Sequence, residues 1–195
     1  MNHVLEEYEG KCDGIYLFGN LDALGFYRKL GFDVVNEYRY FVKDEFCKNT
    51  ENAFKSIENM GDDLKKKYLG LLRKSAPHSA FEQINKYGLQ LFYTGGFDNV
   101  FYCEDSDCFV VLEQDDTVIL QSVLSDNKIA LRDVLERIGF DGRKCMLGFV
   151  PLDEDKDLCV SEKYDGADDY RLLYRGKELE SIERDKLYFP DLSHA

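Results

Sequence analysis

The sequence lacks the apolar stretches that cross a membrane or direct export. No hydrophobic run approaches the roughly 20 residues that a transmembrane helix needs. The first residues, MNHVLEEYEGK, are acidic where a secretory signal has a basic segment followed by an apolar one. We therefore expect a cytoplasmic protein with no membrane partner.

Metal-binding cysteine patterns are also missing, although the chain has six cysteines. There is no Cys-x-x-Cys and no cluster of cysteine with histidine. Cys103 and Cys108 are the closest pair, in a predicted hairpin, but zinc would need two further ligands that the sequence does not space. We predict no metal and mostly buried free thiols. A disulfide framework is the alternative, which an oxidising compartment would favour.

Basic residues are scarce in the second half of the chain. Residues 96–195 carry 24 acidic and 12 basic side chains, a net charge of −12, whereas residues 1–95 carry 14 and 13, a net charge of −1. An acidic surface repels phosphate backbones, so we expect no nucleic-acid partner. The charge would suit a cationic partner or an amine substrate, and a solubilising surface is the alternative.

Several catalytic signatures are absent as well. The chain has no Gly-x-Ser-x-Gly elbow, no Walker loop and no His-Glu-x-x-His. The acidic turns at 153–157 and 165–169 lack calcium-loop spacing, which favours solvated loops over a cation or amine site. His78 and His194 have no evident partners in the sequence. We assign no catalytic role to any histidine.

Hydrophobic residues make up 44% of the chain and aromatic residues 14%, enough for a packed core. The first region, 1–43, predicts a short helix over 3–9, a strand from Gly14, a helix over about 21–30 and a strand over 37–42. Asn20 or Asp22 is expected to cap the second helix. Gly31 supplies the left-handed position that ends it, followed by the hydrophobic contact of Phe32.

The second region, 44–88, predicts a helical connector. Its Lys65–Lys67 run is expected to be a solvated face, and Pro77 ends one helix before another over 79–86. The third region, 89–195, predicts an antiparallel meander, then a helix and two further strands. The predicted fold is α+β, with a mixed, largely antiparallel sheet and packed helices, in two parts joined by the connector. The predicted strands of the third region cover residues 100–103, 108–113, 117–124, 145–150 and 170–175, and its helix spans about 129–138.

One block carries a more specific pattern. Residues 20–32 read N-x-x-A-x-x-F-Y-x-K-x-G-F, with an apolar strand before them and an aromatic strand after them. This block resembles the last motif of the GNAT N-acetyltransferases, an acyl-CoA N-acyltransferase-like fold. The resemblance covers about 30 residues. An ordinary strand–helix–strand unit is the alternative interpretation.

The resemblance implies acetyl-CoA as acyl donor and a small-molecule or peptide amine as acceptor. Asn20 would hydrogen-bond the pantetheine arm, Ala23 and Phe26 would pack along it, and Tyr27 would protonate the departing thiolate. Asn20 and Tyr27 are seven residues apart, about two helical turns, so one helix face presents both. A phenol with a pKa near 10 is a suitable acid for a thiolate of similar basicity.

The sequence departs from the family at the coenzyme's phosphate end. GNAT enzymes hold the pyrophosphate on a Gln/Arg-x-x-Gly-x-Gly/Ala loop, expected about 30 residues before Asn20. The segment from Arg28 to Asp33 fails this pattern at its last position and forms the predicted helix end. Residues 1–43 thus resemble the closing half of a GNAT domain. Residues 44–88 and 89–195 resemble a connector and a degenerate second module, as in tandem-GNAT bacterial acetyltransferases.

Two hypotheses follow. The chain is a truncated acetyltransferase, or it is a non-catalytic remnant that serves as an interaction or dimerisation module. In one form of the second hypothesis, a homodimer completes each half-sheet, because the strand at Ile15 otherwise has an unpaired edge.

Overall fold

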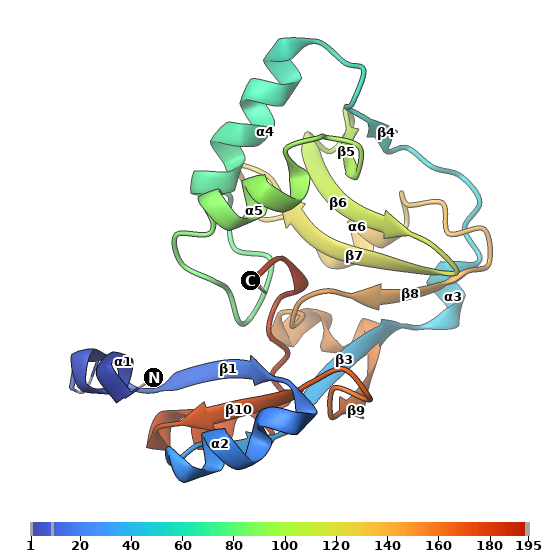
Figure 1. Ribbon diagram of the computed structural model, residues 1–195. Helices are drawn as coiled ribbons and strands as arrows, with labels where there is room; N and C mark the ends of the chain where they lie inside the picture. The colour runs from blue at the N-terminus through green and yellow to red at the C-terminus, as the bar shows by residue number, and fades with distance from the viewer. Residues whose placement is uncertain (1, 9, 194–195) are drawn as a thin grey trace. The chain divides into compact units, whose positions relative to one another are not determined.

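The computed structural model describes residues 2–8 and 10–193, in an α+β fold with mixed, mostly antiparallel sheets (Figure 1). This confirms the predicted fold class. His194, to which we assigned no role, lies outside the described residues. The chain forms two compact units. Unit 1 comprises residues 1–38 and 162–188, and unit 2 comprises residues 39–161 and 189–195.

Unit 1 is built on a three-stranded antiparallel sheet in the order β1-β10-β2. Its strands are β1 (Ile15–Gly19), β10 (Arg171–Arg175) and β2 (Asp33–Val35). The middle strand therefore comes from the far end of the chain. The two units are not consecutive along the chain, unlike the three predicted segments 1–43, 44–88 and 89–195, because β10 pairs with strands of the first segment. The helical elements of unit 1 are α1 (Asn2–Tyr8), η1 (Leu21–Ala23), α2 (Leu24–Lys29) and η3 (Lys177–Ser181).

The end of α2 has the geometry that the sequence predicts. Gly31 has a φ of 81°, and its N–H donates to the Arg28 carbonyl at 3.1 Å. The Phe32 N–H donates to the Tyr27 carbonyl at 3.2 Å, and the two rings pack edge to face with centroids 6.1 Å apart. This pair of hydrogen bonds and its apolar contact form a Schellman motif. The predicted cap by Asn20 or Asp22 is wrong, because the Asn20 side chain makes no capping hydrogen bond and the N-cap position of α2 is Ala23.

Unit 2 contains most of a seven-stranded sheet in the order β4-β5-β6-β7-β8-β3-β9. The predicted meander is confirmed as three antiparallel strands, and β8 then pairs with β7 in parallel. Strand β9 was not predicted. The strands are β3 (Glu37–Val42), β4 (Lys55–Ser56), β5 (Val100–Cys103), β6 (Cys108–Gln114), β7 (Thr117–Leu124), β8 (Lys144–Leu147) and β9 (Cys159–Tyr164).

The connector is less helical than its apolar spacing indicates. The predicted helix over 79–86 is wrong, because Ala80 donates its N–H to the Val150 carbonyl and Phe81 forms a β-bridge with Val150. The next helix starts at Tyr87 and continues through Gly88. The helical elements of unit 2 are α3 (Asp44–Cys47), α4 (Asp62–Lys74), α5 (Tyr87–Thr94), α6 (Leu131–Leu135), η2 (Asp153–Leu158) and η4 (Asp191–Ser193).

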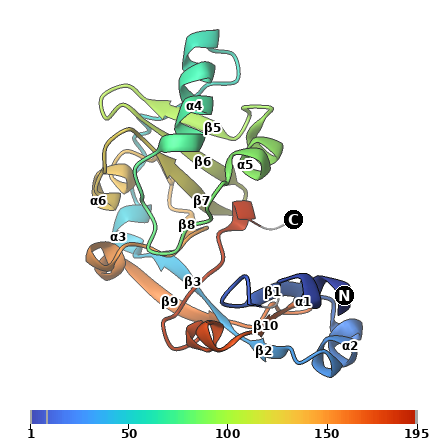
Figure 2. The same cartoon turned by 90° about the vertical axis from the view of Figure 1, so that its left-hand side faces the viewer.

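The core of unit 2 lies on both faces of its sheet. Every residue from Cys108 to Leu112 is buried, as in a strand covered on both sides. Figure 2 shows α4 and α5 on one side of β6 and β7 and α6 on the other. The cluster under α4 consists of Ile57, Tyr68, Leu71, Leu72, Val100, Phe109, Val111, Leu124 and Leu192.

The cysteine prediction agrees with the observed burial. Cys47, Cys103, Cys108 and Cys145 are buried free thiols, and Cys12 is exposed. Cys103 and Cys108 face each other across β5 and β6, and burial raises the pKa of Cys108 to about 11. Such thiols are poor nucleophiles at neutral pH.

Within the described residues, no group of His, Cys, Asp and Glu side chains is arranged to hold a metal ion. No helix among residues 2–8 and 10–193 is both long and apolar enough to traverse a bilayer.

Candidate functional site

The candidate site begins where β1 ends. After Gly19 the chain turns at Asn20, whose carbonyl accepts the Ala23 N–H at 3.0 Å and so opens η1. The Asn20 side chain is exposed and is not used as a helix cap. Its amide is therefore available to a ligand at the junction between strand and helix.

Tyr27 packs back against the same strand end. A Cβ atom at Gly19 would lie 3.1 Å from Tyr27 Cε2 and 2.6 Å from Leu173 Cδ1. The missing side chain of Gly19 thus lets the Tyr27 ring rest against the end of β1. The ring is half-buried and also contacts Phe32. The fold brings Tyr27 to the residue that immediately precedes Asn20.

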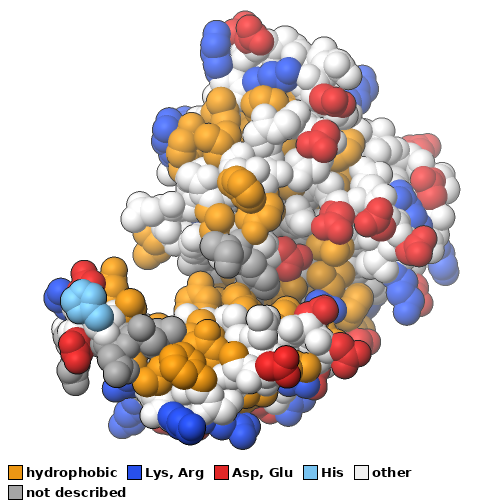
Figure 3. Space-filling model, in the orientation of Figure 1, with side chains coloured by type: hydrophobic (Ala, Val, Ile, Leu, Met, Phe, Trp, Pro, Cys, Tyr) orange, Lys and Arg blue, Asp and Glu red, His pale blue; other side chains and the backbone are white. Residues whose placement is uncertain are grey.

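The other two motif residues are placed differently from each other. Ala23 is half-buried at the end of η1. Phe26 is 54% exposed, and its ring contacts that of Tyr27 at a centroid distance of 5.3 Å. Figure 3 shows hydrophobic side chains at the surface in the region of α2 and β10. An exposed aromatic ring beside Tyr27 offers an apolar surface to a ligand.

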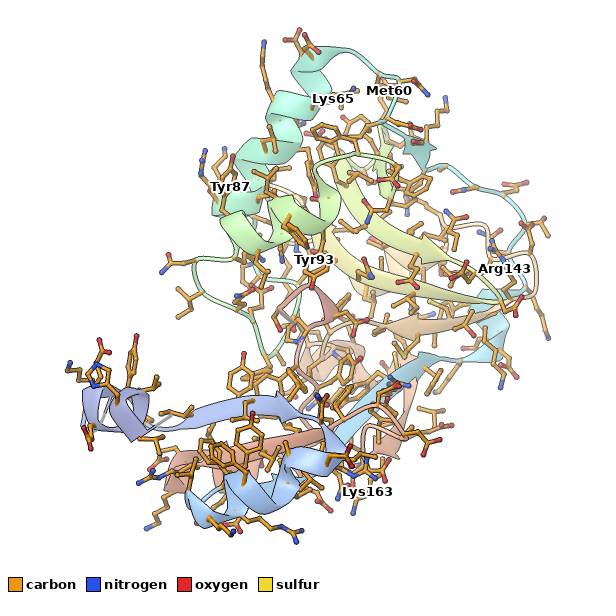
Figure 4. All side chains as sticks on the ribbon, in the orientation of Figure 1. Met60, Lys65, Tyr87, Tyr93, Arg143 and Lys163 are labelled. Atoms are coloured by element: carbon orange, nitrogen blue, oxygen red, sulfur yellow. The ribbon has the colours of Figure 1, made fainter. Side chains whose placement is uncertain are left out.

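A groove of about 680 Å³ lies in unit 2, between α4 and strands β4 and β5. Lys67 on α4 pairs with Asp107, which also accepts a hydrogen bond from the Tyr102 hydroxyl at 2.6 Å. Burial and this hydrogen bond raise the pKa of Tyr102 to about 12, and the bonds from Lys67 and Tyr102 lower the pKa of Asp107. Figure 4 marks Met60, which lines the groove, and Lys65 on α4.

No sequence pattern indicates this groove, because Tyr102 and Asp107 lie far from Lys67 along the chain. Lys67, Asp107 and Tyr102 satisfy one another, so these three side chains form a structural network. The predicted solvated lysine face is exposed at Lys66, whereas Lys65 and Lys67 are half-buried and bonded to the protein at the surface. Lys67 is paired with Asp107, and Lys65 donates to the Glu58 carbonyl at 2.6 Å.

The acidic turns are partly neutralised by the protein itself. Lys156 pairs with Asp153 at 2.7 Å, and Lys128 pairs with Glu154. In the second turn, Arg171 lies 3.6 Å from Asp165. These ion pairs engage Asp153, Glu154 and Asp165, and no group of acidic side chains among the described residues is arranged to hold a metal ion.

His78 has partners that the sequence did not reveal. Its Nε2 lies 3.2 Å from the Ser125 hydroxyl and accepts the Ile129 N–H at 3.2 Å. A serine beside a histidine can act as a nucleophile, but here the Ser125 hydroxyl is buried and donates to the Asn127 carbonyl at 2.5 Å. Because the lone pair on Nε2 is already taken by a backbone N–H, the pair is structural.

Neither the protein-family models nor the curated proteins that were compared contain a match to this sequence. Among solved structures, the chain is similar to a GCN5-related N-acetyltransferase from Kribbella flavida, with a TM-score of 0.48 and 16% identity. That match covers 90% of this chain and 46% of the other. A conserved protein of unknown function from Enterococcus faecalis, described as a probable N-acyltransferase, matches with a TM-score of 0.47 and 12% identity. That match covers 93% of this chain and 49% of the Enterococcus faecalis protein. The chain therefore spans about half the length of both proteins.

Proposed function

We propose that this protein belongs with the GNAT-type N-acyltransferases and that unit 1 binds the thiol end of an acyl-coenzyme A, with an amine as acceptor. One observation carries the proposal. The 20–32 motif folds so that an exposed asparagine amide follows the end of β1, while Tyr27 packs against Gly19 one residue earlier. We also propose that residues 89–195 derive from a second, degenerate module of the same kind.

The residues at this junction fit an extended, amide-bearing ligand. The Asn20 side chain has both a donor and an acceptor, which match the amide groups of a pantetheine arm. Ala23 leaves room beside the helix, and Phe26 offers an exposed apolar surface. The Tyr27 hydroxyl can donate its proton to a thiolate sulfur that departs close to it.

The reaction that we propose is direct transfer. The amine nitrogen bonds to the thioester carbonyl carbon as the carbon–sulfur bond breaks, and the nitrogen loses a proton to water. Tyr27 gives its phenolic proton to the departing sulfur and regains a proton from solvent, so atoms and charge balance. Acetyl is the acyl group that the family resemblance implies.

The test is acetyl-CoA binding by calorimetry, followed by transfer assays with a panel of amines. For Asn20→Ala we expect binding about tenfold weaker, from the loss of a directed hydrogen bond. For Tyr27→Phe we expect unchanged binding and a turnover lower by about 10² or more. Tyr8→Phe, a tyrosine on α1, is the matched control. No binding by the wild-type chain, or equal turnover for Tyr27→Phe, would refute the proposal.

A second candidate function is a dimerisation module. Strand β1 pairs only with β10 in the described sheet and so forms one of its edges, and Tyr16 on this strand is 38% exposed. Exposed edge strands are templates for pairing with another chain. Light scattering tests this candidate: a dimer supports it, and a monomer at all concentrations tested rules it out.

A further inference from the structure

A group of buried polar side chains in unit 2 plays no part in the proposed transferase site. It lies where the irregular segment after α4 enters α5, a helix that Figure 4 identifies by the labels on Tyr87 and Tyr93. The pocket there has an inner volume of about 30 Å³ and is bordered on its other side by β7, Phe149 and Pro190. This enclosed part is large enough for one small polar group, and the pocket also opens to solvent, where the rest of a larger ligand can lie.

Four of the residues that line this pocket each carry a buried side-chain atom with no hydrogen-bond partner among the described residues. These atoms are the Nδ1 atom of His78 and the Oε1 atoms of Gln83, Gln90 and Gln121. His78 is 8% exposed and Gln90 is 6% exposed. Buried polar groups in native proteins are almost always satisfied, so four at one place point to an occupant.

The role of each atom can be assigned from its neighbours. His78 Nε2 accepts the Ile129 N–H, so a neutral ring carries its proton on Nδ1, which is then a donor. Burial lowers the pKa of His78. The nearby Ala76 carbonyl partly offsets this shift in pKa, although Nδ1 has no hydrogen-bond partner of normal geometry. Gln121 donates its Nε2 to Glu113 at 3.1 Å, which turns its oxygen away from that carboxylate.

The charged groups beside the pocket are already paired. Glu82 accepts the backbone N–H of His78 at 3.2 Å and lies 3.5 Å from Lys86. With these two charges neutralising each other, the unpartnered atoms are three amide oxygens and one imidazole N–H. The pocket therefore requires an occupant with more donors than acceptors.

We propose that the pocket holds the ammonium group of a small primary amine that also carries an oxygen acceptor close to the nitrogen. An ammonium group has three N–H donors and no acceptor, matching the oxygens of Gln83, Gln90 and Gln121. The His78 Nδ1–H donates to the neighbouring oxygen of the ligand. The net charge of −12 over residues 96–195 favours a cationic ligand over an anionic one. Ordered water is the competing occupant, because about 30 Å³ also admits water.

The proposal is tested with isotope-labelled full-length chain by NMR. Ammonium chloride and ethanolamine are titrated while the His78 imidazole and glutamine side-chain amide signals are followed. Sodium chloride and tetramethylammonium chloride at the same ionic strength are controls, because neither cation can donate a hydrogen bond. We expect saturable shifts with ammonium and with ethanolamine, tighter binding of ethanolamine, and no saturable shift with either control.

Two variants connect the signal to the pocket. Gln90→Met removes one acceptor at nearly constant volume and should weaken ammonium binding at least about tenfold. Gln114→Met, at an exposed position on β6, is the matched control and should bind as the wild type does. If Gln90→Met does not fold, Gln83→Met serves in its place. Equal shifts with tetramethylammonium, undiminished binding by the variants, or no saturable shift at all would overturn the proposal; the last result would assign the pocket to water.

Discussion

The two units of this protein use their hydrophobic residues in opposite ways. In unit 2, the sheet is covered on both faces and strand β6 is buried along five consecutive residues. Unit 1 leaves nearly as many large hydrophobic side chains exposed as it buries. Its buried ones are Phe32, Val35, Leu172, Leu173, Ile182 and Tyr188, and its exposed ones are Val4, Tyr8, Tyr16, Leu21 and Phe26.

Buried apolar surface stabilises a fold, whereas exposed apolar surface can contact a ligand or partner. A sheet with helices on both sides removes enough apolar surface from water to hold a fold together. A three-stranded sheet with exposed aromatic residues contributes less, and its apolar surface is available to a ligand or partner. The 20–32 motif therefore lies in the unit that buries fewer large hydrophobic side chains.

The comparison is tested most strongly by truncating one phenylalanine in each unit. Phe109→Ala, in the cluster under α4, should lower the free energy of unfolding by about 3–5 kcal/mol. Phe26→Ala, at an exposed position on α2, should change it by less than about 0.5 kcal/mol. Urea unfolding followed by circular dichroism measures both, and similar losses for the two variants would contradict the contrast.

Two glycines in unit 1 allow a second test. Gly19→Ala brings a Cβ to 2.6 Å from Leu173 and 3.1 Å from Tyr27, so we expect a loss of about 1–3 kcal/mol and a displaced Tyr27 ring. Gly25→Ala, in α2 with no atom within 4 Å of the new Cβ, should stabilise the protein by about 0.5–1 kcal/mol. Thermal unfolding distinguishes them, and two changes of the same sign would show that Gly19 is not a packing requirement.

A buried hydrogen bond in unit 2 gives a smaller effect. The Tyr68 hydroxyl donates to Thr94 Oγ1 at 2.7 Å, and Thr94 donates in turn to the Gln90 carbonyl at 2.8 Å. Tyr68→Phe should cost about 1–1.5 kcal/mol in unfolding free energy, since Thr94 keeps its own acceptor. Tyr8→Phe, at an exposed position in unit 1, should cost nothing measurable in the same denaturant experiment.

The smallest expected effect is the pH dependence from His78. Burial lowers its pKa in the folded state below the usual 6.5, so at acidic pH the unfolded state binds the extra proton more readily. Stability should therefore fall as the pH drops through about 6.5 and below. His78→Gln should lose this part of the dependence when unfolding is compared between pH 7.5 and 5.5. An unchanged slope would mean that another group is responsible.

Local signals in the sequence were sufficient for much of the fold. Gly31 and Phe32 predict the end of α2 because a Schellman motif involves only adjacent turns. Runs of strand-forming residues separated by turn residues predict the meander. The failed prediction over 79–86 has a long-range cause, because Val150 draws that segment into an extended bridge. Nothing near β10 in the sequence indicates that it pairs with β1 and β2.

The candidate sites also differ in whether local sequence signals or long-range contacts bring their residues together. Asn20 and Tyr27 could be proposed from the sequence because one motif spans both, whereas the contribution of Gly19 required coordinates. The pocket at His78 combines Gln83 and Gln90 with Gln121 from a separate strand, so no spacing along the chain identifies it. Lys67 and Asp107 are likewise joined only by the packing of α4 near the β5–β6 hairpin.

The position of β10 between β1 and β2 sets an order of events during synthesis. Leu172, which pairs with Val35, leaves the ribosome about 140 residues later, which corresponds to roughly 7–30 s at ordinary elongation rates. Throughout that interval β1 and β2 have no described strand to pair with, and the meander of unit 2, which ends at Leu124, is synthesised before β10. The nascent chain therefore carries two unpaired apolar strands ahead of a folding domain, and a chaperone that shields them would act on this protein before its last strand is made.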